Sequence, residues 1–179
     1  MNMIELILSR HSYRGKYLPV SVPRNDLREI VEAGLAAPSG CNKQTTSLIA
    51  VDDPSVLEQL YTAIGRPYEG TAPAMICVVT QKIMAYADRT FYIQDYAAAI
   101  ENLLLAIVAK GYQSCWHEGD ITGEDSEKGS QMAKILGLPA DHMVVCYLPV
   151  GIAADEVNPR AKKPFAERAW LNGYQQEWK

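Results

Sequence analysis

The chain has 179 residues, of which 48% are hydrophobic and 21% are charged. These values are typical of one folded domain with a substantial core, and they argue against an intrinsically disordered chain. With 21 acidic and 17 basic side chains, the formal net charge is −4. This mild acidic excess gives no reason to expect nucleic acid or an anionic membrane as a partner.

Cysteine spacing and hydropathy bound the class of protein further. Structural zinc sites draw ligands from short spacings, and no two cysteines here are close in sequence, so no metal site is expected. Cys77 and Cys146 stand in apolar runs and are expected to be buried, reduced thiols. The N-terminus lacks the pattern of a signal peptide, and the longest apolar stretch contains Glu101 and Asn102. We therefore expect a soluble, cytoplasmic protein.

Apolar periodicity and turn signals predict three helices and two strands in the first half of the chain. Asn25 or Asp26 would cap the second helix, and Pro38 would end it. The third helix has a clearer start, because Asp53 is a good cap and Pro54 fits the first helical position. The predicted elements are a helix over 3–9, a helix over 26–36, a strand over 48–51, a helix over 54–64 and a strand over 74–80.

The longest predicted helix runs over residues 92–110 and stops at Gly111. It is apolar nearly all round over 103–109, which indicates a dimer core or a central helix. Residues 155–179 show no clear periodicity and are predicted to form an extended C-terminal arm. Three further elements are expected between them: a strand over 113–116, a helix over 126–136 and a strand over 143–150.

This mixture of elements favours an α+β (α/β layered) fold with helices on the faces of a central sheet. Neither a repeat nor a change of composition marks a second domain. The sequence therefore predicts a single domain over 1–179, with 155–179 as its arm.

A basic cluster follows the first predicted helix. Arg10, Ser12 and Arg14 offer two guanidinium groups and a hydroxyl, which suits a phosphate. The alternative is a solvated helix end, where cations complement the helix dipole without any ligand. A second basic group, with Arg160 and Lys162, stands near the C-terminus and could converge on the same phosphate.

Residues 38–44 form a loop of small and amide residues. A plain helix-to-strand connection would explain its composition. That explanation leaves out the paired amides of Asn42 and Gln44, which can donate and accept against a polar-edged ring, while Gly40 would permit close backbone approach. Cys41, like Cys115 further on, is expected to be a small packing residue.

A third stretch, residues 114–119, is either a strand followed by a turn or a second edge of the same site. In the functional interpretation, the backbone N–H groups near Glu118 and Gly119 face a ring nitrogen or carbonyl. His117 could instead be a general base, or Cys41 a nucleophile, but no hydrolytic motif accompanies them. The glycine-rich phosphate motifs of Rossmann and P-loop proteins are absent.

Taken in order, these stretches resemble the nitroreductase family of FMN-dependent, NAD(P)H-utilising flavoproteins. The likeness covers nearly the whole chain. Two departures stand out: Thr45 and Thr46 replace a frequent Pro and aromatic residue, and Lys162 stands where Arg is common. The matching stretches are Arg10–Arg14, Ala37–Gln44, Asp95–Ala106, Gly111–Trp116, Glu118–Gly119 and the pair Arg160 and Lys162.

The resemblance implies a central, mostly antiparallel sheet flanked by helices, in an intertwined homodimer with exchanged C-terminal arms. It implies no catalytic side chain and no metal. The first and last basic groups would hold the FMN phosphate and ribityl chain, the 38–44 loop would come from the other subunit and face the ring, and Arg66 is a candidate for one more contact. The implied cofactor-binding residues are Arg10, His11, Ser12, Arg14, Pro38, Ser39, Gly40, Asn42, Gln44, Glu118, Gly119, Arg160 and Lys162.

The function implied is ping-pong transfer of hydride from NAD(P)H through bound FMN to a small-molecule acceptor such as a nitroaromatic or quinone. Alternatives on the same fold are a flavin-binding protein with little turnover, for storage or sensing, and a specialised dehalogenase or flavin-modifying relative. A hydrolase using His117 or Cys41 is the third alternative.

Overall fold

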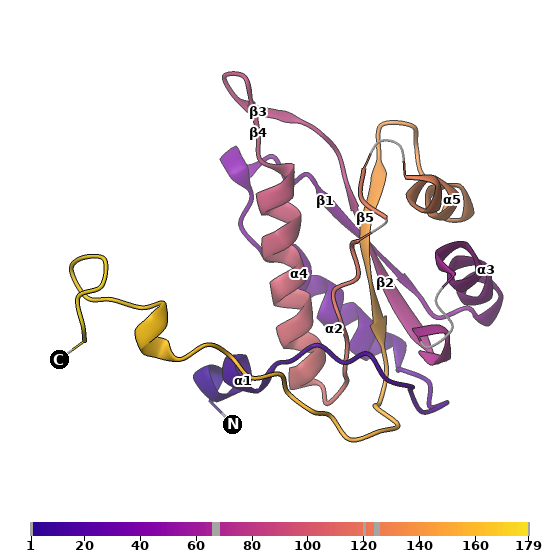
Figure 1. Cartoon of the computed structure of the whole chain (residues 1–179). Coiled ribbons are helices and arrows are strands. Elements are labelled where there is room, and N and C mark those ends of the chain that lie inside the picture. The colour runs from indigo at the N-terminus through magenta and orange to yellow at the C-terminus, as the bar shows by residue number, and fades with distance from the viewer. Residues whose placement is uncertain (1, 66–68, 120, 124–125, 179) are drawn as a thin grey trace.

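The computed structural model describes residues 2–65, 69–119, 121–123 and 126–178. Across these ranges, the chain folds into a three-stranded sheet covered by helices on both faces, with a small separate hairpin (Figure 1). The helices and strands therefore form the layered α+β arrangement that the sequence predicted.

The sheet has the strand order β1-β2-β5, and both pairs are antiparallel. Every residue of the central strand β2 (Ala74–Thr80) is buried, as expected from its continuous apolar run. The strand predictions over 74–80 and 143–150 are confirmed by β2 and β5 (Met143–Val150). Strand β1 (Thr46–Val51) begins two residues earlier than predicted.

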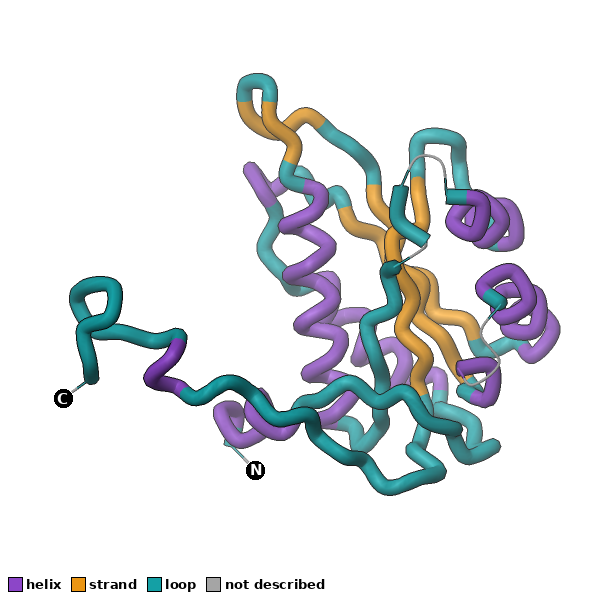
Figure 2. Tube along the Cα trace, viewed as in Figure 1, coloured by secondary structure: helices purple, strands orange, loops and turns teal. Residues whose placement is uncertain are grey.

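One face of the sheet is covered by α2 (Arg24–Leu35) and α4 (Tyr92–Ala109), and the other by α3 (Pro54–Ile64) and α5 (Glu127–Ile135) (Figure 2). Alternate β2 residues divide between the two cores: Ile76 packs with the first helix pair and Cys77 with the second. The sheet is thus the middle layer of three.

Helix α2 packs closely against α4 and β1 because Gly34 has no side chain. A Cβ atom at Gly34 would lie 2.7 Å from Leu103 and 2.8 Å from Leu48. Within α4, the N-terminal residues Asp95 and Tyr96 are buried together with the apolar face. The close approach fixes α4 relative to the loop that leaves α2, and this loop carries predicted site residues.

Helix starts follow the caps only where the side chain is free to cap. Asp53 accepts hydrogen bonds from the backbone N–H groups of Ser55 (2.8 Å) and Val56 (3.2 Å), so the predicted start of α3 is confirmed. The expected cap of α2 at Asn25 or Asp26 is wrong, because this helix begins at Arg24 after Pro23. Asn25 instead bonds Glu29, and Asp26 bonds residues of the α4 end.

The predicted strand over 113–116 is wrong. Only isolated bridges form there, from Gln113 to Gly151 and from His117 to Tyr147. The reason is that the Ser114 carbonyl accepts the N–H of Tyr13 at 2.9 Å, so the segment shares its hydrogen bonds between two neighbours and builds no continuous ladder.

The hairpin of β3 (Met84–Tyr86) and β4 (Arg89–Thr90) was not predicted. Its turn places Ala87 at a φ of 50°. Gly or Asn is the usual residue in this conformation, and because neither stands here, the sequence carries no turn signal. The hairpin projects beyond the N-terminal end of α4 in Figure 1. Short 3-10 turns at Gly40–Asn42 (η1), Glu69–Thr71 (η2) and Phe165–Glu167 (η3) complete the elements.

The two ends of the chain lie outside the layers. Helix α1 (Met3–Ser9) buries none of its residues and exposes Leu8 to 79%. The segment after residue 155 extends away from the body of the domain (Figure 1). Its side chains Phe165, Tyr174 and Trp178 are 64%, 76% and 57% exposed. Among the described residues, no helix combines the length and the apolar character needed to cross a membrane.

Candidate functional site

A basic pocket forms where the N-terminal cluster meets the C-terminal arm. Its volume is about 430 Å³. Two segments separated by about 150 positions in the sequence build it, and all but one of the lining side chains can donate hydrogen bonds. The lining residues are Arg10, His11, Ser12, Arg14, Arg160, Ala161 and Lys162.

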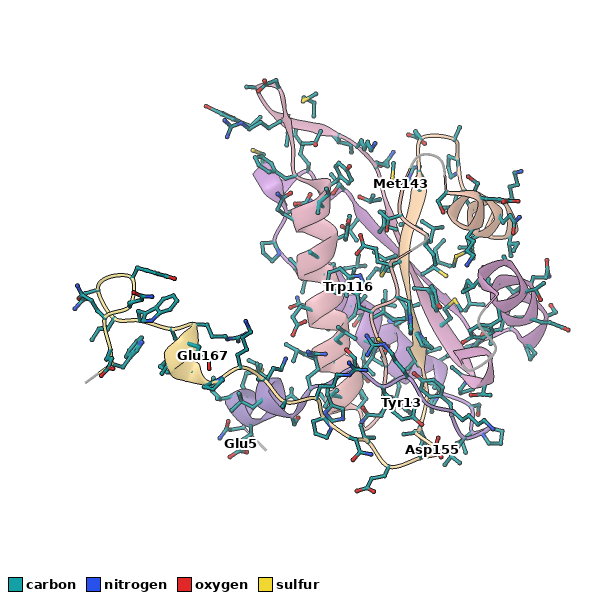
Figure 3. The ribbon with its side chains drawn as sticks, viewed as in Figure 1. Glu5, Tyr13, Trp116, Met143, Asp155 and Glu167 are labelled. Carbon is teal, nitrogen blue, oxygen red and sulfur yellow. The ribbon has the colours of Figure 1, made fainter. Side chains whose placement is uncertain are left out.

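Tyr13 anchors the two segments that form this pocket. It is 5% exposed and packs edge-to-face on Tyr17, with ring centroids 5.2 Å apart. Its hydroxyl donates to the Lys16 carbonyl and accepts the N–H of Asp155 at 3.3 Å, so it ties the cluster to the first residue of the arm (Figure 3). The N–H of Ala154 also donates to the Lys16 carbonyl at 2.9 Å. These contacts bring the arm alongside the cluster.

Two further details of the pocket concern Arg10 and His11. Arg10 Nε lies 3.5 Å from Glu101 Oε1, which links the pocket to helix α4. His11 Nε2 is buried and has no hydrogen-bond partner among the residues that the structure describes. Buried polar atoms are normally satisfied, so this nitrogen is an exception among the described residues.

The 38–44 loop lines a different and smaller pocket of about 180 Å³, which it shares with Asp95 and Ala99 of α4. Three residues of the loop that are not glycine are left-handed: Cys41, Asn42 and Gln44, with φ of 50°, 53° and 49°. Pro38, Ser39 and Gln44 line this pocket, whereas none of them lines the basic one. Within one protomer, the structure therefore does not bring the two predicted halves of the site into one pocket.

Inside the loop, Gly40 has an additional role within the protomer, and Cys41 differs from its expectation. A Cβ atom at Gly40 would meet the Phe91 side chain at 2.4 Å, so the missing side chain makes room for a neighbour in the same protomer. Cys41 was expected to pack inside, but it is exposed. The amides of Asn42 and Gln44 bond one another at 3.3 Å and remain exposed.

Glu118 is held by two donors. The Tyr96 hydroxyl bonds one carboxylate oxygen at 3.0 Å, and Trp116 Nε1 bonds the other at 2.8 Å. Burial, and then the Glu118 carboxylate, raise the pKa of Tyr96, so this hydroxyl stays protonated and donates. The side chain of Glu118 thus fixes the turn that contains Gly119, whose φ is 28°.

His117 next to this turn is 7% exposed and stacks on Tyr147, with ring centroids 4.9 Å apart and an angle of 11° between the planes. A stacked, buried ring of this kind is typical of core packing. The geometry gives no support to His117 as a general base.

With this geometry in place, comparison with known proteins decides the family. A family model described as "Nitroreductase family" matches residues 7–68 and 65–152. The chain belongs to the nitroreductase family. The family and fold class predicted from the motifs are therefore confirmed.

Individual nitroreductase relatives are distant in sequence but close in structure. A protein of Archaeoglobus fulgidus, provisionally named NADH dehydrogenase/NAD(P)H nitroreductase, is 28% identical over 155 residues, which cover 86% of each chain. A solved structure from Parabacteroides distasonis with the same provisional name is 26% identical, with a TM-score of 0.81 and coverage of 97% of this chain and 100% of that chain. A nitroreductase with bound FMN from Bacteroides fragilis is 27% identical, with a TM-score of 0.76 and coverage of 97% and 100%.

In this nitroreductase chain, helix α4 supports all three candidate segments. Asp95 bonds Gly40 in the 38–44 loop and Thr45 directly after it. Tyr96 bonds Glu118, and Glu101 pairs with Arg10. Sequence reasoning placed Asp95 and Tyr96 in a motif without a role. A carboxylate in a mostly apolar helix was the available signal, since a buried charge requires partners.

Most of the cysteine thiols in this nitroreductase chain are buried. All four cysteines are free; Cys77, Cys115 and Cys146 are buried as expected. Burial raises the pKa of the Cys77 thiol to about 12 and that of Cys146 in the same direction, which keeps both unreactive. Arg66 lies outside the described residues.

Proposed function

We propose that this protein is an FMN-dependent oxidoreductase that uses NAD(P)H to reduce a small electrophilic acceptor such as a nitroaromatic or a quinone. The observation that carries the proposal is the basic pocket, in which residues from both ends of the chain converge. The Bacteroides fragilis relative, which is solved with bound FMN, supports the choice of cofactor.

The donor set of the pocket fits a phosphate dianion. Arg10, Arg14 and Arg160 offer planar forks that match phosphate oxygens, Lys162 adds a point charge, and Ser12 adds a hydroxyl. His11 also lines the pocket and adds one further polar side chain. We assign these side chains to the phosphate and the adjoining ribityl chain.

The proposal includes a homodimer in which each site takes residues from both subunits. Exposed apolar side chains support it: Met3, Ile4 and Leu8 on α1 are 66%, 64% and 79% exposed, and Phe165 and Trp178 on the arm are also largely exposed. Exposed apolar patches are typical of interaction sites, so we assign these side chains to the dimer interface. We assign residues 155–179 to a dimer-wrapping arm of the single domain.

The ring of the cofactor would then lie between the two subunits. The 38–44 loop of one subunit would face it, through Pro38, Ser39, Gly40, Asn42 and Gln44, which explains why this loop and the basic pocket stand apart in one protomer. The backbone of Glu118 and Gly119 would lie along its redox edge.

Bound FMN would supply the chemistry by accepting hydride from the nicotinamide and passing it to the acceptor. The protein itself would bind and orient the cofactor. The basic side chains neutralise the phosphate, Tyr96 and Trp116 hold the Glu118 turn still, and no side chain is assigned an acid–base role.

An absorbance spectrum of the purified protein, followed by anaerobic titration with NADH and with NADPH, tests the proposal. We expect one flavin per protomer and rapid bleaching by at least one of the two. Flavin that is bound but not bleached by either nucleotide would favour a storage or sensing protein instead of an enzyme. A protein that takes up no added FMN would contradict the proposal.

A further inference from the structure

The buried carboxylate of Asp95 connects helix α4 to both ends of the left-handed loop. Asp95 is 4% exposed. Its Oδ1 accepts the backbone N–H of Gly40 at 2.7 Å, and its Oδ2 accepts the hydroxyl of Thr45 at 2.7 Å. Because each oxygen has a donor, both buried acceptor atoms are satisfied.

The loop between these two contacts needs such support. Cys41, Asn42 and Gln44 all have positive φ, which Asn tolerates and which is unfavourable for Cys and Gln. Strained backbone of this kind persists only where its surroundings hold it, and it is often found at functional sites. Gly40 precedes the three residues and Thr45 follows them, so Asp95 holds the strained segment at both ends.

Thr45 is itself fixed to the sheet. It is 2% exposed, and its carbonyl accepts the N–H of Gln81 and the hydroxyl of Thr80, each at 3.1 Å. Thr80 ends the central strand β2. The Asp95 contacts therefore join the loop, the first turn of α4 and the sheet into one support.

We propose that Asp95 is the positioning residue of the 39–45 loop and that, through Gly40 and Thr45, it sets how this loop meets the redox cofactor and thus how fast NAD(P)H reduces it. This inference rests on the proposed function. Asp95 itself touches neither cofactor nor substrate in this assignment. It acts through the backbone and amide groups that the loop presents.

Two variants and two controls separate the contacts. Thr45→Val removes one donor and keeps the shape, whereas Thr45→Ser keeps the hydroxyl and serves as the conservative rescue. Asp95→Asn keeps the size and removes the charge. Gln94→Ala changes the exposed neighbour in the same turn of α4 and controls for changes in the helix.

The first measurement needs no flavin. Hydrogen exchange of the backbone amides in residues 40–44 reports how firmly the loop is held in the flavin-free protein. We expect faster exchange in Thr45→Val and Asp95→Asn than in the wild type, and no change in Thr45→Ser or Gln94→Ala. Unchanged exchange in both test variants would overturn the claim that Asp95 holds the loop.

The second measurement uses the flavin-loaded protein. Thr45→Val and Asp95→Asn should still bind stoichiometric FMN, because the basic pocket is untouched. Their rate of flavin reduction by NAD(P)H in anaerobic stopped flow should fall about 10- to 100-fold, as expected when a reacting group is misplaced by about 1 Å. Thr45→Ser should reduce at nearly the wild-type rate.

The outcomes distinguish this inference from the function on which it rests. Faster exchange with an unchanged reduction rate would make Asp95 a structural residue only, and would overturn its positioning role. If Asp95→Asn does not fold, Thr45→Val against Thr45→Ser carries the comparison. A wild-type protein that binds no FMN would overturn the proposed function itself, and this role of Asp95 with it, whatever the exchange results.

Discussion

Arg10 Nε lies 3.5 Å from Glu101 Oε1, and this contact ties the basic pocket to the middle of helix α4. Glu101 is half exposed, and an ion pair of this kind contributes about 0–1 kcal/mol to folding. Loss of this ion pair alone is therefore small compared with the stability of a folded domain. The position of Arg10 is explained by the ligand that the pocket is proposed to take.

Removal of the two N-terminal arginines should empty the pocket without unfolding the protein. We expect Arg10→Ala combined with Arg14→Ala to give a folded, colourless protein, because two charge-assisted contacts to the phosphate are lost, each of about 1.5–3 kcal/mol. Flavin released per protomer on denaturation measures the effect. Arg28→Ala combined with Lys134→Ala removes the same charge from exposed helix surfaces and should keep the flavin. Stoichiometric FMN in the first double variant would disprove the phosphate assignment.

The Glu118 turn offers a test that needs no cofactor. Tyr96→Phe removes one of the two donors to the carboxylate, and because Tyr96 is 3% exposed, water does not readily replace it. We expect the free energy of unfolding to fall by about 1.5–3 kcal/mol, the value of a hydrogen bond to a charged group. Chemical denaturation at one protomer concentration measures this. Combination with Glu118→Gln should be less than additive, and strict additivity would mean that the two groups do not interact.

Elements with strong local signals were predicted well, and the misses have physical reasons. The Asp53 cap and the continuous apolar run of β2 are local features, so both elements lie where expected. Segment 113–116 looks like a strand, but Tyr13 takes one of its hydrogen bonds. That competition comes from a residue 101 positions away, and no local pattern reports it.

The candidate site was likewise predicted only in part. Donor types allowed the Arg10 and Arg160 groups to converge, the family resemblance implied that they do, and the pocket brings these side chains together. The role of Asp95 was missed because its partners, Gly40 and Thr45, stand 55 and 50 positions earlier in the chain. Thr45 was noted only as a departure from the family pattern. Its hydrogen bond to Asp95 now gives it a structural role.

Acid should weaken the contact between α2 and the end of α4. Hydrogen bonds from Tyr112 and then Lys110 hold the pKa of Asp26 below its ordinary value of 3.8. A carboxyl whose pKa is depressed on folding stabilises the fold above its unfolded pKa, and this stabilisation is lost as the pH falls through the folded pKa. Asp26→Asn should therefore lower the melting temperature near neutral pH, and the difference should shrink in acid, below about pH 4.

Melting temperatures of both proteins across this range give the comparison. Asp88→Asn, in the exposed turn of the β3–β4 hairpin, is the matched control and should follow the wild type at every pH. A difference between Asp26→Asn and the wild type that stays constant into acid would show that the charge of Asp26 is not what stabilises this contact.

The C-terminal arm is proposed to serve both the pocket and the dimer, and two variants separate these roles. A chain ending at Asn158 keeps Val157 packed near Tyr13 and Tyr17, so the domain should still fold. It loses Arg160 and Lys162 as well as the exposed aromatic residues of the arm. We expect both FMN retention and dimer mass to decrease, as measured by flavin content and light scattering.

Arg160→Ala combined with Lys162→Ala keeps the arm and removes only its charges. This protein should remain a dimer while its Kd for FMN rises at least about tenfold, because charge-assisted contacts to the phosphate are lost. Phe165→Ala combined with Trp178→Ala should do the reverse, since these largely exposed side chains lie outside the basic pocket. It should weaken the dimer first, and lose flavin only as the protomers separate. If the shortened chain kept both its flavin and its dimer mass, the arm would have neither role.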